Sequence, residues 1–202
     1  MSVYPANAEN IRKAAEIILN GGIVIYPTET VYGIGCNPRS REATERICRV
    51  KGREEKPLPI ICSDMESAEQ AAIFNDMARK LTAYFWPGPL MIILQARGLY
   101  PKAVTQGNIT IGLRVPGSYI SRSLAKQAGG YIISTSANKS GQPPATTAFE
   151  ARMQLGCEVD MILDGGPSST NISSTILDLS GKHPKILRVG PITEQEIEKI
   201  LN

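Results

Sequence analysis

The sequence predicts an α/β fold: a single domain in which a twisted, mixed sheet of parallel and antiparallel strands is flanked by helices. Short apolar runs end at Gly or Pro, and amphipathic helical patterns lie between many of them. Other apolar runs follow one another with no helix between them, which is typical of antiparallel neighbours. No composition shift or internal repeat divides residues 1–202, so we expect one domain.

The first fifty residues alternate helix and strand. Asn7 can cap a helix that runs to about Asn20, because apolar residues recur there at helical spacing and two glycines follow. Residues 23–26 form a continuous apolar run that Pro27 ends, and residues 31–35 follow as a second strand or an extended loop. Ser40 then begins a helix with one apolar face.

The middle of the chain contains a strand in which alternation places Thr110, Gly112 and Arg114 on one face. Before it we expect, in order, strand 58–62, helices 65–72 and 75–85, strand 90–94 and a polar loop. After it we expect helix 118–127, strand 131–133, loops 134–138 and 139–147, helix 148–155, strands 161–163, 174–179 and 185–189, and helix 194–201 capped by Thr193.

Composition restricts the function only weakly. The chain has 42% hydrophobic and 20% charged residues and a net charge of +3, which permits an anionic substrate or an RNA partner. The four cysteines have no Cys-x-x-Cys spacing and His183 is the only histidine, which argues against a zinc site. With no secretory or membrane-spanning pattern, we expect a cytoplasmic protein with free thiols and no membrane contact.

The first candidate for chemistry is the segment from Lys51 to Pro59. It presents Lys51, Arg53 and Lys56 on a loop whose exit is extended by two prolines, a plausible anion cradle. The alternative is a solvated basic turn balanced by Glu54 and Glu55. A Walker phosphate loop is absent, so ATP would need a different cradle.

A second polar loop complements this cradle. Ser136 and Asn138 follow an apolar strand, and their hydroxyl and amide groups can bind phosphate, ribose or base atoms. Arg114 and Arg188 add guanidiniums at strand positions, where a bidentate contact to a carboxylate or phosphate is held rigidly.

Each of these residues also has a structural interpretation. Thr28 can serve a turn after Pro27, and Arg114 can cover the sheet with its stem. Hydrogen bonds to the local backbone could account for the loop side chains of Ser134, Ser136 and Asn138. Simple exposure on a strand could account for Ser174 and Arg188.

Six short motifs follow one another along nearly the whole chain: Pro27-Thr-Glu-Thr-Val-Tyr-Gly-Ile-Gly35, Lys51-Gly-Arg53 with Lys56-Pro-Leu58, Trp86-Pro-Gly-Pro-Leu90, Leu113-Arg-Val-Pro116, Ser134-Thr-Ser-Ala-Asn138 and Leu187-Arg-Val-Gly-Pro191. In this order they resemble the motifs of the YrdC-like threonylcarbamoyl-AMP synthase family. The resemblance implies a YrdC-like single-domain form over residues 1–202 with a concave basic ligand-binding face.

The resemblance also implies a reaction. L-Threonine, bicarbonate and ATP would give threonylcarbamoyl-AMP and pyrophosphate, with Mg²⁺ carried by ATP and no resident metal. A downstream complex would transfer the threonylcarbamoyl group to adenosine 37 of tRNAs that read codons beginning with A. The residue types present are consistent with this reaction. An anionic carbamate must approach an anionic phosphate, and Lys51 and Arg53 can screen the two charges as catalytic residues.

By position, the resemblance divides the site residues between two substrates. The threonine pocket would comprise Thr28, Arg114, Ser134 and Ser174, with Arg114 on the carboxylate. The ATP site would comprise Lys51, Arg53, Thr110, Ser136, Asn138, Pro144 and Arg188. Some longer relatives carry Asn-Pro-Leu and a nearby His facing threonine, where this chain has Lys56-Pro57-Leu58 and Ile61. The threonine pocket of this chain is therefore expected to differ from theirs on that side.

Two alternatives stay open. A tRNA or double-stranded RNA binding module without catalysis would suit the mild positive charge and the concave face that the resemblance implies. A module of a larger carbamoyl-transfer enzyme would share the adenylation chemistry. That alternative is disfavoured because no acyl-phosphatase or zinc motif accompanies the chain.

Overall fold

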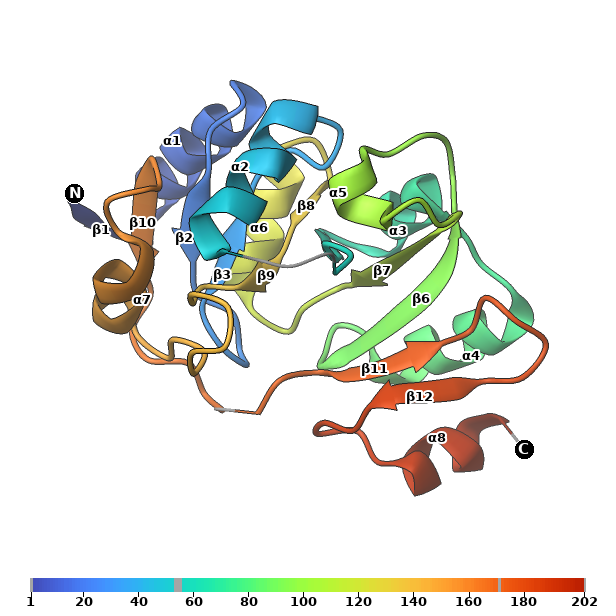
Figure 1. Cartoon of the computed structure of the whole chain (residues 1–202). Helices are drawn as coiled ribbons and strands as arrows, with labels where there is room; N and C mark the ends of the chain where they lie inside the picture. Colours follow the sequence, from blue (N-terminus) through green and yellow to red (C-terminus); the bar gives the residue numbers. More distant parts are fainter. Residues whose placement is uncertain (1, 53–55, 171, 202) are drawn as a thin grey trace.

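The computed structural model describes residues 2–52, 56–170 and 172–201, and its strands form two mixed sheets (Figure 1). The β2 sheet has the order β1-β10-β2-β3-β9, and the β6 sheet the order β12-β11-β6-β7-β4-β8, with β5 on β6. The strands are β1 (Val3–Pro5), β2 (Val24–Tyr26), β3 (Gly33–Gly35), β4 (Ile60–Cys62), β5 (Ala72–Ile73), β6 (Leu90–Ala96), β7 (Thr110–Arg114), β8 (Tyr131–Ile133), β9 (Thr135–Ser136), β10 (Met161–Asp164), β11 (Thr175–Asp178) and β12 (Lys185–Arg188).

The helices lie mainly where their caps predict them. Asn7, Ser40, Asn75 and Ser118 each accept a hydrogen bond from a backbone N–H three residues on, which fixes four helix starts. The helices are α1 (Ala8–Leu19), α2 (Arg41–Lys51), α3 (Met65–Ala71), α4 (Asp76–Phe85), α5 (Lys102–Thr105), α6 (Tyr119–Gln127), α7 (Ala148–Leu155) and α8 (Glu194–Leu201).

Mixed pairing is confirmed in both sheets. β10 pairs in parallel with β1 and β2, whereas β3 is antiparallel to β2 and β9. In the other sheet β6 is antiparallel to β7 but parallel to β11. The expectation of one sheet needs refinement, since the strands divide into two.

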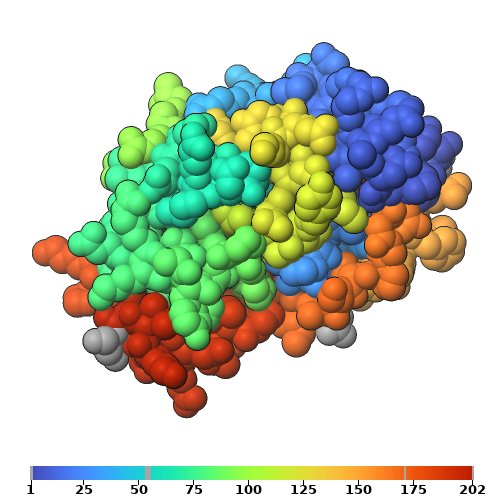
Figure 2. Space-filling view, turned by 180° about the vertical axis from the view of Figure 1, so that it is seen from behind, coloured from blue at the N-terminus to red at the C-terminus, as the bar shows by residue number. Residues whose placement is uncertain are grey.

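Several strands are apolar at every position because both of their faces are buried. Around β2, Ile23 and Ile25 pack in one hydrophobic cluster, whereas Val24 and Tyr26 pack in a second cluster beneath α1 and α6. Successive side chains of a strand point to opposite faces, so one run serves both clusters. Figure 2 shows the reverse side of the molecule, where α1 (blue) lies beside α6 (yellow) and α4 (green) beside α8 (red).

Four short elements of the structure were not predicted from the sequence. β1, β5 and β9 have three residues or fewer, and α5 has four residues within the stretch expected to be a polar loop. The three strands are fixed by pairing with distant neighbours, because so few residues show little alternation, and four residues of α5 cover only about one helical period. β9 matters most, since it converts part of the expected 134–138 loop into a strand beside β3.

Residues 131–136 carry the chain from one sheet to the other. β8 belongs to the β6 sheet and β9 to the β2 sheet, with Ser134 between them. The Ile133 N–H donates to the Cys36 carbonyl and the Ser134 N–H to the Pro59 carbonyl, at 2.9 and 2.8 Å. A Cβ on Gly35 would lie 2.2 Å from the Ile133 oxygen, so this close approach requires glycine.

Candidate active site

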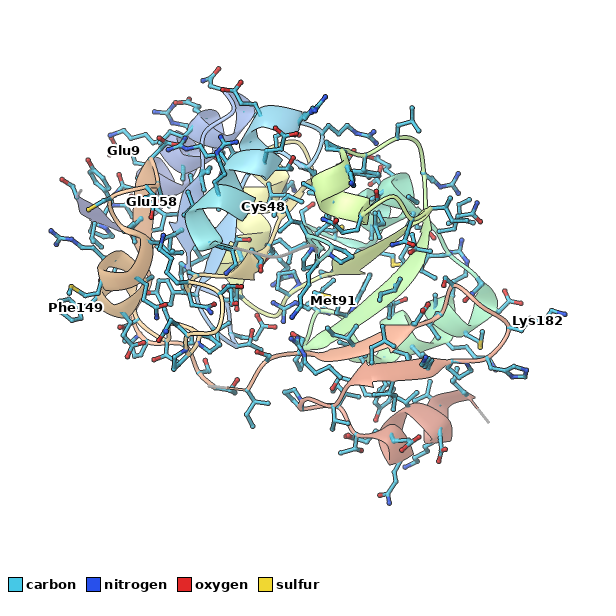
Figure 3. All side chains as sticks on the ribbon, viewed as in Figure 1. Glu9, Cys48, Met91, Phe149, Glu158 and Lys182 are labelled. Atoms are coloured by element: carbon cyan, nitrogen blue, oxygen red, sulfur yellow. The ribbon has the colours of Figure 1, made fainter. Side chains whose placement is uncertain are left out.

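A cavity of about 500 Å³ opens between the two sheets and contains most of the predicted ligand-binding side chains. One wall comes from the turn after β2 and from the 134–136 segment, and the other from β6, β7, β11 and β12. Met91 of β6 lies in this central region (Figure 3). The volume falls within the range of small-molecule sites.

The turn after β2 is held by Thr28. Its hydroxyl donates to the Val31 carbonyl at 2.7 Å and accepts from the N–H groups of Thr30 and Val31 at 3.2 and 3.3 Å. Thr28 therefore serves the turn, as the structural interpretation expected, and also lines the cavity. The turn uses the hydroxyl proton and both lone pairs, so Thr28 shapes the cavity wall rather than offering it a free hydrogen-bonding group.

Arg114 is the most deeply buried cation on the cavity wall among the described residues. Its side chain is 5% exposed, and Nη1 donates to Glu29 Oε1 at 3.1 Å and to Ser174 Oγ at 2.6 Å. Its Nε–H is buried without a partner. Burial lowers the pKa of Arg114, while the charge of Glu29 and then Tyr26 oppose that shift. The interpretation of Arg114 as a solvated surface residue is therefore wrong.

Ser174 connects two arginines. Its hydroxyl accepts from Arg114, and its carbonyl accepts from Arg188 Nε at 2.9 Å. Arg188 is exposed at the cavity, and partial desolvation together with the charge of Arg114 lowers its pKa. The two guanidiniums thus make this end of the cavity electropositive, which suits an anionic ligand.

Lys51 points its ammonium into the backbone of the second polar loop. Lys51 is 3% exposed, and Nζ donates to the Ser136 carbonyl and, at 2.7 Å, to the Asn138 carbonyl. The Ser140 N–H donates back to the Lys51 carbonyl at 2.8 Å. The pairing of the two loops expected from residue types is therefore present, but lysine holds the loop rather than lining the cavity.

Asn138 is also committed to its own loop. Its amide nitrogen donates to the carbonyls of Lys139 and Gln142 at 2.9 and 2.7 Å, whereas its Oδ1 is buried without a partner. Local capping accounts for the nitrogen, as the structural interpretation expected. The oxygen is a free acceptor that loop capping does not explain.

The cavity gathers six of the predicted residues: Thr28, Arg114, Ser134, Ser174, Ser136 and Arg188. Lys51, Thr110, Asn138 and Pro144 do not line it, although Thr110 shares the strand β7 with Arg114. Pro144 is exposed on the connection before α7. Arg53 lies outside the described residues, so its predicted roles in catalysis and ATP binding stay predictions.

Several site residues were not expected from the sequence. Glu29, the ion-pair partner of Arg114, could have been suspected, since a carboxylate between buried residues needs a cation. Tyr32 lines the cavity, and burial raises its pKa to about 12 while its hydroxyl donates to the Gly166 carbonyl. The apolar lining comes from the segment before β4 and from strand faces that alternation alone could not orient: Pro57, Pro59, Ile61, Met91, Ile93, Ile176 and Leu187.

The chemistry of the described lining suits anions. Within residues 2–52, 56–170 and 172–201, no group of three or more His, Cys, Asp or Glu side chains could hold a metal ion. The described polar lining consists of hydroxyls and cations, including Lys56. A metal ion carried by an anionic substrate would be compatible with this lining. No helix in the described ranges is long and apolar enough to cross a membrane.

Comparison with known proteins identifies relatives over nearly the whole chain. Threonylcarbamoyl-AMP synthase of Pyrococcus abyssi is 36% identical over 193 residues, or 95% of this chain and 57% of that protein. Threonylcarbamoyl-AMP synthase of Bacillus subtilis is 34% identical over 199 residues, or 96% and 57%. The crystal structure of P. abyssi Sua5 complexed with L-threonine superposes with a TM-score of 0.95 at 34% identity, covering 100% of this chain and 61% of that one.

The chain therefore spans 57% of the length of both curated relatives. The Sua5/YciO/YrdC family model, described as "Telomere recombination", matches residues 16–190. Since this match includes both walls of the cavity, we conclude that the chain belongs to the Sua5/YciO/YrdC family.

Proposed function

We propose that this protein is an L-threonylcarbamoyladenylate synthase, which converts L-threonine, bicarbonate and ATP to threonylcarbamoyl-AMP and pyrophosphate. The observation that carries the proposal is the buried Arg114 in a cavity lined by hydroxyl groups. The unpartnered Nε–H of its guanidinium is a donor for which a carboxylate is the natural acceptor. The names of both relatives and the threonine complex of P. abyssi Sua5 support it.

Threonine would bind with its carboxylate on Arg114 and with Thr28, Ser134 and Ser174 around it. All three residues line the same cavity. The hydroxyls of Ser134 and Ser174 can hydrogen-bond the substrate, and Thr28 shapes the wall beside it. The apolar lining, including Ile61 and Met91, offers a surface for the methyl group of the substrate.

ATP would bind toward Ser136 and Arg188. Both residues line the cavity, and the buried Lys51 and Asn138 support the loop that carries Ser136. In the reaction, the amine of threonine combines with bicarbonate to form a carbamate, with loss of water. An oxygen of this carbamate then attacks the α-phosphorus of ATP while the bond to pyrophosphate breaks. Mg²⁺ would enter with ATP and neutralise the leaving pyrophosphate, and gathering three substrates would supply much of the rate.

The product would be consumed by a partner complex that transfers the threonylcarbamoyl group to adenosine 37 of tRNA. The same proposal places the protein in the cytoplasm, where these substrates meet. Direct contact with tRNA or double-stranded RNA is a further proposal, supported only by the mild positive charge.

Pyrophosphate release tests the proposal. We expect release from Mg-ATP that requires both L-threonine and bicarbonate, and a reduction of kcat/KM by about 100-fold or more in Arg114→Ala. Arg41→Ala, at an exposed i,i+4 pair with Glu45, is the matched control and should keep wild-type kinetics. Pyrophosphate release that does not depend on both threonine and bicarbonate would contradict the proposed function. RNA binding that weakens steeply with salt, without such release, would favour the binding module.

A further inference from the structure

The side chain of Glu29 makes two hydrogen bonds, one of them to the cavity residue Arg114. One carboxylate oxygen, Oε1, accepts from Arg114 Nη1 at 3.1 Å, and the other, Oε2, accepts from the Ser118 N–H at 3.3 Å. Its backbone carbonyl accepts from the Thr170 N–H at 3.2 Å. Glu29 does not line the cavity and is 21% exposed at its side chain. Its side chain reaches the cavity lining through its hydrogen bond with Arg114.

The contacts of Arg114 distinguish the edges of its guanidinium. A guanidinium has two N–H bonds on each Nη and one on Nε. The two bonds of Nη1 match its two acceptors, Glu29 Oε1 and Ser174 Oγ. The Nε–H has no partner, and no acceptor for Nη2 occurs in the described part of the chain. Nε and Nη2 form the edge that a carboxylate binds with two parallel hydrogen bonds.

We propose that Glu29 is a positioning residue that holds Nη1 of Arg114, so that the Nε and Nη2 edge stays available as a bidentate receptor for the substrate carboxylate. The inference rests on the proposed function and names the substrate group that this edge recognises. Glu29 and the substrate do not compete, because they use different edges of one guanidinium. With Glu29 paired to Arg114, the charge of the neighbouring Arg188 remains to attract an anion.

Glu29→Gln is the decisive variant because it keeps the size of the side chain and removes its charge. We expect the Kd and KM for L-threonine to rise about tenfold, since a charged hydrogen bond to Nη1 becomes a neutral one. The kcat and the KM for ATP should stay near wild type. Glu45→Gln, which breaks the exposed pair with Arg41, is the matched control and should leave the Kd and KM for L-threonine unchanged.

A second variant separates positioning from a general structural role. Arg114→Lys keeps the charge but has no planar edge for a carboxylate. In that background Glu29→Gln should have little further effect on the KM for threonine, because there is no edge left to orient. Equal effects in both backgrounds would overturn the inference.

The outcomes are distinguishable from failure of the proposed function. If the wild type releases no pyrophosphate in response to threonine, the proposed function fails. If the wild type is active and Glu29→Gln has wild-type affinity for threonine, the inference alone fails. Loss of ATP affinity, or of the folded state by circular dichroism, together with loss of threonine affinity would show that Glu29 is merely structural and would also overturn it.

Discussion

Lys51 illustrates how a single residue can serve a site without touching the cavity. Its buried ammonium joins the C-terminal end of α2 to the 136–138 segment, with a sequence separation of 85 residues to Ser136. The charge expected to face a phosphate therefore faces two carbonyl dipoles in this structure. Its predicted contact with ATP stays a prediction, whereas its role in holding the loop is a property of the fold.

Lys51→Met should therefore affect stability as well as activity. The buried Asn138 carbonyl would lose its lysine donor, and the Ser136 carbonyl would keep only the Asn138 N–H. We therefore expect the free energy of unfolding to fall by about 1 to 3 kcal/mol and ATP to bind more weakly. Denaturant titration and calorimetry with ATP measure the two effects. Lys102→Met on the exposed side of α5 is the control. Unchanged stability would show that the loop does not depend on this lysine.

At the scale of elements, Asp160 joins three segments around β2. Its Oδ2 accepts from the Ile23 N–H at 2.7 Å and from Arg46 Nη1 of α2 at 2.6 Å, and its Oδ1 accepts from Arg46 Nη2 at 3.0 Å. Partial burial acts to raise the pKa of Asp160. The hydrogen bonds from Arg46 and Ile23 and the charge of Arg46 outweigh burial and hold the pKa below its ordinary value.

Asp160→Asn should lower the free energy of unfolding by about 1 kcal/mol at pH 7, since solvent screens a pair that is one-third exposed. A depressed folded pKa stabilises the protein above the unfolded pKa of about 4, and the contribution disappears as pH falls through the folded value. Urea titrations at several pH values should show the two proteins converging below about pH 4. Glu69→Gln, at the exposed pair with Arg79, is the control. A difference that does not shrink as pH falls below about 4 would contradict the ionic origin.

The whole molecule presents a cavity whose walls belong to different sheets. The β2 sheet contributes the turn after β2 and residues 135–136, and the β6 sheet contributes Arg114 and the apolar faces of β6 and β11. A ligand between these walls stabilises both sheets together, because it binds only when they are correctly placed.

Thermal unfolding should detect this coupling. Mg-ATP and L-threonine together should raise the Tm more than either alone, and a ligand at about 100 times its Kd contributes about 2.7 kcal/mol. D-Threonine, with the same charges and atoms, should have little effect. Equal shifts with both enantiomers would indicate an effect of salt rather than of the site.

The sequence by itself determined most elements and the residue types of the site. Caps and apolar runs depend on neighbours within a few residues, so Asn7, Ser40 and Thr193 begin their helices as predicted. The motif resemblance identified the family and six residues that line the cavity. Local secondary structure could therefore be predicted from the sequence alone.

Only the tertiary structure decided how these elements share the site. Strands buried on both faces carry no signal of which face meets which neighbour, so one expected sheet became two. The Glu29 contact to Arg114 spans 85 residues and the Lys51 contact to Asn138 spans 87. Such pairs depend on packing between sheets rather than on local pattern. That packing assigns Lys51 to the loop and leaves one edge of Arg114 unpaired.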